Sequence, residues 1–261
     1  MDVRFGATVE AFMRYVTDLG LDHVEFKREY LAGHPDTPGP REVRELAERF
    51  DVSLTYHAPF RDWNVGSYDE TVRRDSVARV KRTLDDAAEA GAEAVVVHGG
   101  SVPKRYPAWV RERGEANALQ SLAECAEYAQ QVGVPLCLEN QPVSDHKQRY
   151  TTTSTDLAAM LETVDIKPAS LGVTLDVGHA KVNGEGWQTF VDRFGERIRV
   201  CHLHDNDGTG DDHEPLPEYE ALVEAIPADC FVFEMKSVAD VATCAGVDAT
   251  PPATEVATDD W

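Results

Sequence analysis

The chain has 261 residues, of which 42% are hydrophobic, with 18 Gly and 14 Pro, a composition that excludes an intrinsically disordered or collagen-like chain. Its formal net charge of −22 repels the phosphates of nucleic acids and disfavours a general nucleic-acid binder. No apolar run approaches the roughly 18 residues that a membrane span needs. The first ten residues carry charges where a signal peptide has an apolar segment. We therefore expect a cytoplasmic protein.

The basic residues comprise 18 Arg and only 7 Lys. An excess of Asp and Glu with little Lys is expected in a salt-adapted proteome, so we interpret the chain as halophilic. At 1 M salt the Debye length is about 3 Å. Under that interpretation the net charge says little about the substrate.

Eight short apolar segments predict β-strands at Val3–Gly6, His23–Phe26, Ser53–His57, Ala94–His98, Pro135–Glu139, Leu171–Asp176, Ile198–His202 and Cys230–Glu234. Helical periodicity fills the intervals, as over Thr71–Ala90 and Glu115–Val132. Strands that alternate with helices predict a parallel sheet. Eight such units in about 250 residues predict an α/β fold with a single (β/α)8 TIM barrel. An open doubly wound sheet is the main alternative.

The predicted barrel occupies residues 1–236, without an internal repeat or linker. Within its strands large apolar side chains alternate with small or polar ones, so we expect the large ones to pack against helices and the others to face the barrel axis. Residues 237–261 are rich in Ala, Thr, Asp and Pro. They predict a weak last helix and a short, frayed acidic tail.

Ionisable residues stand at the carboxyl ends of the predicted strands, where barrel enzymes build their active sites. They are His57, His98, Glu139, Asp176, His202 and Glu234, with His179 just beyond the sixth strand and Asp211 and His213 in the loop after the seventh. Imidazole and carboxylate groups are ligands of divalent metals. A single such residue is more often hydrogen-bonded or solvated, but nine that converge without a cation would repel or desolvate one another. The pattern therefore predicts a metal centre.

Two further residues carry weaker signals. His204 shares a strand face with His202 but lies beyond the strand end, so we expect it to contact substrate or support a ligand. Glu25 lies near the end of the second strand, and we interpret it as an ion-pair partner of Arg4 in preference to a metal ligand.

The arrangement from residue 3 to 236 resembles the xylose isomerase-like barrel superfamily, which contains sugar-phosphate isomerases and epimerases and also endonuclease IV. In the epimerase branch, Glu, Asp, His and Glu from the last four strands hold one divalent ion. Those positions fall on Glu139, Asp176, His202 and Glu234, and a substrate-contacting His falls on His179. The resemblance implies one manganese, zinc, cobalt or magnesium ion.

The endonuclease branch holds three zinc ions instead. The resemblance then adds His57, His98, His179, Asp211 and His213 as ligands. The chain has every ligand type of that site, yet it has Gly where the branch usually has Cys before the sixth-strand His, and it reads HLHDND where the branch usually reads HLND. The HLHDND form is similar to isomerase/epimerase-like members, although those often continue with PLGEG and this chain with PLPEY.

We therefore predict a divalent-metal-dependent sugar or sugar phosphate isomerase/epimerase. Glu139 and Glu234 would transfer protons through a metal-stabilised enediolate, and His179 would orient the substrate oxygens. The alternative is an endonuclease IV-like trinuclear zinc phosphodiester hydrolase of the AP endonuclease type; a barrel that binds without turnover is a third interpretation. We expect a small-molecule sugar or sugar phosphate as partner and neither nucleic acid nor membrane, while a homo-oligomer stays open.

Overall fold

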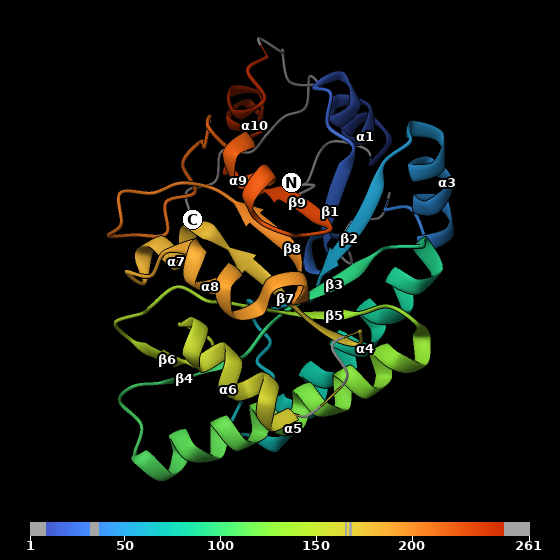
Figure 1. Cartoon of the computed structure of the whole chain (residues 1–261). Helices are drawn as coiled ribbons and strands as arrows, with labels where there is room; N and C mark the ends of the chain where they lie inside the picture. Colours follow the sequence, from blue (N-terminus) through green and yellow to red (C-terminus); the bar gives the residue numbers. More distant parts are fainter. Residues whose placement is uncertain (1–8, 32–36, 165, 167–168, 248–261) are drawn as a thin grey trace.

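A computed structural model gives the fold and describes residues 9–31, 37–164, 166 and 169–247 (Figure 1). Seven parallel strands form one sheet in the order β1-β2-β3-β5-β7-β8-β9. They are β1 (His23–Lys27), β2 (Ser53–His57), β3 (Ala94–His98), β5 (Leu136–Glu139), β7 (Leu171–Asp176), β8 (Ile198–Leu203) and β9 (Cys230–Phe233). Each agrees with its predicted strand to within one residue at either end. The first predicted strand, Val3–Gly6, lies outside the described residues.

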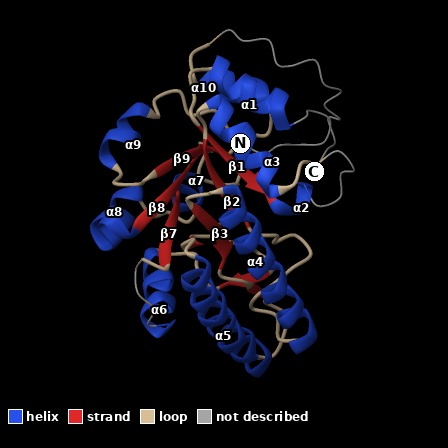
Figure 2. Ribbon diagram, turned by 90° about the vertical axis from the view of Figure 1, so that its right-hand side faces the viewer, coloured by secondary structure: helices blue, strands red, loops and turns tan. Residues whose placement is uncertain are grey.

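The sheet curves until its edge strands β9 and β1 lie beside each other, and helices cover its outer face (Figure 2). The helices are α1 (Val9–Asp18), α2 (Arg28–Leu31), α3 (Pro40–Phe50), α4 (Glu70–Ala90), α5 (Ala108–Val132), α6 (Ser154–Val164), α7 (Val177–Val182), α8 (Trp187–Phe194), α9 (Glu220–Ala225) and α10 (Val238–Cys244), with a 3-10 turn at Gly195–Arg197. The protein is an α/β TIM barrel. Its parallel strands carry their carboxyl ends to one mouth, where the candidate site lies.

The strand residues separate into two packing layers, as the alternation predicts. Small and medium side chains form a separate cluster inside the barrel, made of Ala94, Val96, Cys137, Val200 and Val232. The larger apolar residues of the same strands join the core between sheet and helices. Because the barrel axis is filled below the mouth, polar strand-end side chains gather in one layer above it.

Two features differ from the sequence-based expectation. Strands β4 (Ser101–Pro103) and β6 (Lys147–Arg149) form a two-stranded antiparallel ribbon beside the mouth. Helix α5 begins at Ala108, ahead of the predicted Glu115. The Arg111 guanidinium of its first turns donates to the carbonyls of Lys104 and Tyr106, which ties the preceding basic loop to the helix.

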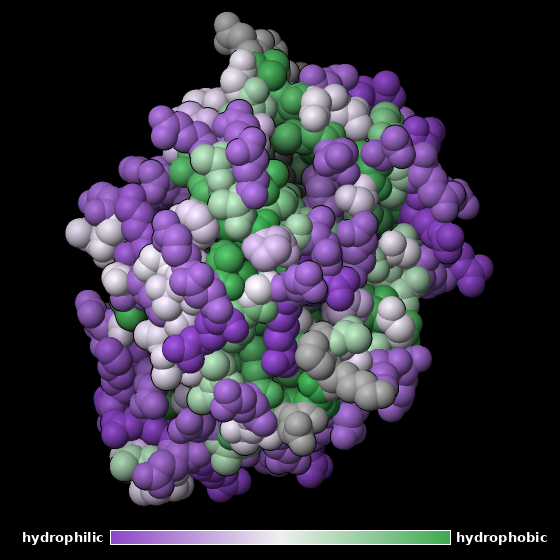
Figure 3. All heavy atoms as spheres, in the orientation of Figure 1, coloured by the Kyte–Doolittle hydropathy of each residue, from purple (hydrophilic) through white to green (hydrophobic). Residues whose placement is uncertain are grey.

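The last helix, α10, follows β9, and residues 248–261 of the predicted tail lie outside the described part of the chain. The division at residue 236 stays a prediction. Among the described helices, none is long and apolar enough to cross a membrane. Figure 3 shows hydrophilic residues around the edge of one face and apolar residues reaching the surface near its centre.

Candidate metal centre

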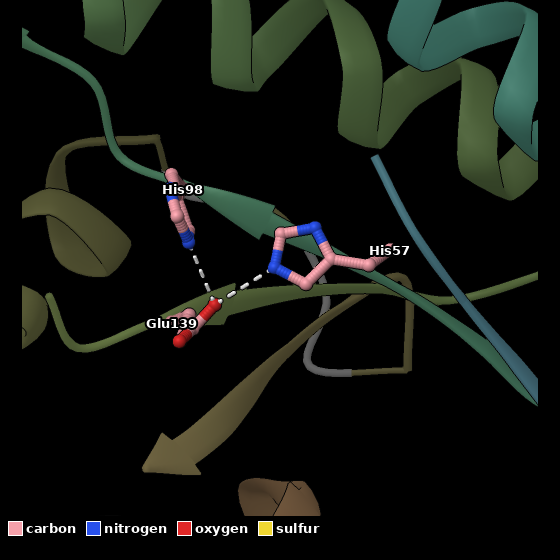
Figure 4. A group of neighbouring side chains, drawn as sticks. All are labelled: His57, His98 and Glu139. Carbon is pink, nitrogen blue, oxygen red and sulfur yellow. Dashed lines mark hydrogen bonds and ion pairs between the residues drawn. The ribbon is translucent and has the colours of Figure 1, made fainter. Parts of the chain in front are cut away.

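The first group of donors joins three neighbouring strands. His57, His98 and Glu139 end β2, β3 and β5, and the parallel register pairs His98 with Glu139. The Nε2 atoms of His57 and His98 lie 3.2 and 3.1 Å from the same oxygen, Oε2 of Glu139 (Figure 4). Two imidazoles therefore converge on one carboxylate oxygen.

The second group surrounds Nδ1 of His202 on β8. This nitrogen lies 3.7 Å from Oε1 of Glu139, 3.9 Å from Oδ2 of Asp176 and 3.7 Å from Oε1 of Glu234. Three carboxylates, two at the ends of β5 and β7 and one directly after β9, therefore face one imidazole nitrogen, although Glu139 and Glu234 are 95 residues apart in sequence (234 − 139).

The third group lies toward the loop after β8. Nε2 of His179 is 3.3 Å from Asp211 Oδ2, and Nε2 of His213 is 3.5 Å from Asp211 Oδ1. Nδ1 of His179 is 3.3 Å from Glu139 Oε1, which links this group to the others. The structure thus brings all nine predicted residues into one continuous cluster, with Glu139 at its centre.

In three imidazoles the hydrogen bond made by Nδ1 determines which ring nitrogen carries the proton. Nδ1 of His57, His179 and His213 lies 2.8, 2.8 and 2.6 Å from the backbone carbonyl oxygens of Ala58, Asn140 and Glu234, respectively. Since a carbonyl only accepts, we assign a proton to each Nδ1. In the neutral imidazole the lone pair of Nε2 then faces a carboxylate, a repulsive contact unless a proton or cation intervenes. Metal-binding histidines are held in this way.

His202 is held by a carboxylate instead. Its Nε2 lies 3.3 Å from Oε2 of buried Glu25, which also accepts from Thr55, while its Nδ1 is buried without a hydrogen-bond partner among the described residues. His202 lowers the pKa of Glu25 to about 2, against the opposite effect of burial. Arg4, the expected partner of Glu25, lies outside the described residues. Glu25 thus orients His202 toward the donor cluster.

The donor spacing also fits a cation. Ligands about 2.1 Å from a tetrahedral zinc ion lie about 3.4 Å apart. The imidazole–carboxylate separations given above run from 3.1 to 3.9 Å, and the donor atoms of each group of three lie within 4.8 Å of one another. An orphaned buried nitrogen, imidazole Nε2 atoms aimed at carboxylates and matching spacing together show that these residues fit a divalent metal.

The electrostatics follow from many charges in a buried space. Burial raises the pKa of Glu139, but the surrounding imidazoles, His98 foremost, hold it well below its ordinary value. Burial lowers the pKa of His179, yet Asp176 and the neighbouring carboxylates raise it well above 6.5. Against burial, Asp211 and Glu234 raise the pKa of His213 to about 9. In the absence of a metal, protonated imidazoles and ionised carboxylates therefore stabilise one another as ion pairs.

Sequence reasoning missed two basic residues at the mouth. Lys27 ends β1, and its Nζ lies 2.8 Å from Oε1 of Glu234, with both side chains at most 10% exposed. Burial lowers the pKa of Arg149 on β6, while the carboxylates of Asp211 and Glu139 raise it. The strand-end rule that selected the other donors also covers Lys27, but Arg149 lies on a ribbon that periodicity does not reveal.

The fold and the site define an α/β barrel whose mouth carries a cluster of potential metal ligands. A sequence model described as xylose isomerase-like TIM barrel matches residues 13–237, so the chain belongs to the xylose isomerase-like TIM barrel family.

The uncharacterized protein MJ1311 of Methanocaldococcus jannaschii is 34% identical over 179 residues, 67% of this chain. The chain covers 59% of the length of that relative. A probable endonuclease 4 of Mycobacterium leprae is 35% identical over 186 residues, 68% of each protein. The crystal structure of a D-tagatose 3-epimerase-like protein superposes with a TM-score of 0.77 at 28% identity, covering 94% of both chains.

Proposed function

We propose that the chain is a divalent-metal-dependent isomerase or epimerase of a sugar or sugar phosphate. The observation that carries the proposal is that Oε1 of Glu139 and Oε1 of Glu234 each lie 3.7 Å from Nδ1 of His202. Two carboxylates therefore border one donor group, as the removal and return of a proton require. The likeness to a D-tagatose 3-epimerase-like protein supports the proposal.

The residues of the site have three roles: binding the cation, transferring the proton and orienting the substrate. Glu139 and Glu234 take part in the first two. When bound, a divalent cation supplies Lewis-acid polarisation of the substrate oxygens, which makes the neighbouring C–H more acidic. Asp176 and His202 would hold it together with Glu139 and Glu234. Glu139 and Glu234 would remove and return the proton. Their pKa values are held well below the ordinary value, so both are carboxylates at neutral pH. His179 would orient the substrate oxygens.

Burial favours a small substrate over a polymer. Glu139, Asp176 and His202 are at most 1% exposed, and Glu234 is 8% exposed. A substrate must therefore enter the barrel mouth to reach the two carboxylates. The net charge of −22 also repels a polyanion at low salt.

A second candidate function is phosphodiester hydrolysis, because the two oxygens of Glu139 face two different donor groups. Its Oε2 faces His57 and His98, while its Oε1 faces His179 and His202. A carboxylate shared between neighbouring donor groups suits a site with metals about 3.5–4 Å apart. The 35% identity to a probable endonuclease 4 supports this candidate.

Deuterium exchange separates the two candidates. Zinc- or manganese-loaded protein is incubated in D2O with ketohexoses and their phosphates, and in parallel with an oligonucleotide that contains an abasic site. We expect deuterium to enter the carbon beside the substrate carbonyl, detected by NMR, and the oligonucleotide to stay intact. Glu139→Gln should abolish exchange, whereas Glu127→Gln, on the exposed face of α5, should not. Strand cleavage without exchange would replace the proposal with the second candidate.

A further inference from the structure

His204 lies against the donor cluster but is held differently from the other imidazoles. It follows β8 directly and is 1% exposed. Its Nε2 lies 3.0 Å from Oδ1 and 3.2 Å from Oδ2 of Asp176. Its Nδ1 is buried and has no hydrogen-bond partner in the part of the chain that the structure describes.

The missing partner locates the proton. Backbone carbonyls accept from Nδ1 of His57, His179 and His213, which leaves Nε2 of each as a ligand atom. Among the described residues no acceptor lies beside Nδ1 of His204, whereas the Asp176 carboxylate lies beside its Nε2, so we place a proton on Nε2, where this carboxylate accepts it. A nitrogen that donates to a carboxylate has no lone pair for a metal.

We propose that His204 is a positioning residue that orients the Asp176 carboxylate toward the metal centre and is not itself a ligand. Oδ1 of Asp176 also accepts from the backbone N–H of His179, at 2.7 Å. These two donors hold the carboxylate with Oδ2 3.9 Å from Nδ1 of His202. Nδ1 of His179 lies 3.2 Å from Oδ2 as well, so without His204 the backbone at the start of α7 and this imidazole contact would remain to fix its rotation.

Gly178 makes room for the His204 ring. A Cβ atom at position 178 would lie 2.0 Å from Cε1 and 2.3 Å from Nδ1 of His204, far inside contact distance. Gly is a poor residue inside a helix, yet it stands in α7. The close approach explains it: any side chain at Gly178 would displace the imidazole from Asp176.

The inference rests on the proposed metal-dependent function, and zinc affinity is its first test. Zinc is titrated against a fluorescent chelator with the wild-type protein, His204→Leu and His204→Gln. We expect about 10–100-fold weaker binding for His204→Leu, as for other residues that support a ligand. The glutamine Nε2–H can replace the imidazole donor, so His204→Gln should recover most of the affinity. His146→Leu, at an exposed position, is the matched control.

Each outcome has a distinct meaning. Wild-type affinity in folded His204→Leu would reduce His204 to a space filler and overturn the proposal. Loss of one bound ion per chain in both variants would make His204 a ligand and also overturn it. If the wild-type protein binds no zinc, the proposed function fails. The tautomer of His204 tests the positioning role independently of zinc binding. 15N-resolved NMR of the metal-free protein should show His204 protonated on Nε2, and protonation on Nδ1 alone would overturn the assignment.

A double-mutant cycle tests the link to Gly178. Gly178→Ala should weaken zinc binding about as much as His204→Leu, although Ala favours the helix more than Gly does. The combined variant should be no weaker than His204→Leu alone, because the ring that the new methyl group displaces is already absent. Gly39→Ala, whose Cβ would have no neighbour within 4 Å, is the control. Additive losses would contradict the shared mechanism.

Discussion

Zinc loading of the metal-free protein at pH 7 should release protons, and their number should report how many donor groups fill. His213 illustrates the reason. Its Nδ1 donates to the carbonyl of Glu234, and its Nε2 faces Asp211 at 3.5 Å, with a pKa of about 9. At pH 7 about 99 of 100 molecules therefore carry a proton on the nitrogen that a cation would need.

The displaced proton has a calculable effect on affinity. Two pH units below the pKa, proton competition weakens binding at His213 about 100-fold, or about 2.7 kcal/mol. Apparent zinc affinity at this group should rise at least about tenfold from pH 7 to pH 8. The pKa is also raised at His57, His179 and His202, and lowered at His98. Filling all groups should therefore release about three protons, one each from His179, His202 and His213, whose pKa values lie well above 6.5.

Calorimetry in two buffers with different ionisation enthalpies measures the proton count, and elemental analysis gives the zinc count. If zinc occupies only the group around His202, about one proton should appear. His213→Ala should release about one proton fewer than wild type, whereas His146→Ala, at an exposed position, should match it. Full loading with no proton released would mean that the imidazoles are neutral in the metal-free protein, and the electrostatic reasoning would be wrong.

Three further predictions concern stability. The metal-free protein should lose stability above neutral pH, since the raised pKa of His213 contributes at most about 3 kcal/mol that is present below pH 6.5 and lost as pH rises through about 9. The lowered pKa of Glu25 acts oppositely: its contribution to stability is present above pH 4.5 and is lost as pH falls toward about 2. Circular dichroism melts from pH 2 to 10 measure both effects. A melting temperature that does not change in either pH window would refute the two assignments. Lys27→Met removes the nearest cation from the buried Glu234 carboxylate, to which His202 and His213 lie farther away, and should cost up to about 3–5 kcal/mol in urea unfolding. Excess zinc should offset much of that loss, and exposed Lys104→Met should cause none. If the acidic surface reflects salt adaptation, thermal midpoints should rise with KCl up to molar concentrations, and unchanged midpoints would contradict it.

The barrel and most of its donors could be predicted because both follow from local rules. Strand periodicity located β2, β3 and β7 to the residue, and the carboxyl-end rule then selected His57, His98 and Asp176. These side chains meet because parallel register brings strand ends together, so no knowledge of the loops is needed. The convergence of these strand ends was predictable because position along a regular element determines position in space.

The remaining features depend on contacts that no local pattern encodes. Glu25 meets His202 across 177 positions, and the sequence offered a nearer basic partner in Arg4. His213 reaches the cluster through a left-handed backbone conformation, φ 51°, that non-glycine residues seldom adopt. The orientation of His204 depends on the absence of a side chain at Gly178. Each needs the packed structure before it can be recognised.

The donors extend from His57 to Glu234, so the cluster has a consequence for biosynthesis. A nascent chain that still lacks β9 cannot present Glu234, and the carbonyl of that residue, which holds His213, is also absent. The full constellation can form only after the ribosome has released nearly the whole barrel and the sheet has curved round. Cation uptake would therefore come late in maturation and would distinguish finished barrels from truncated or misassembled ones.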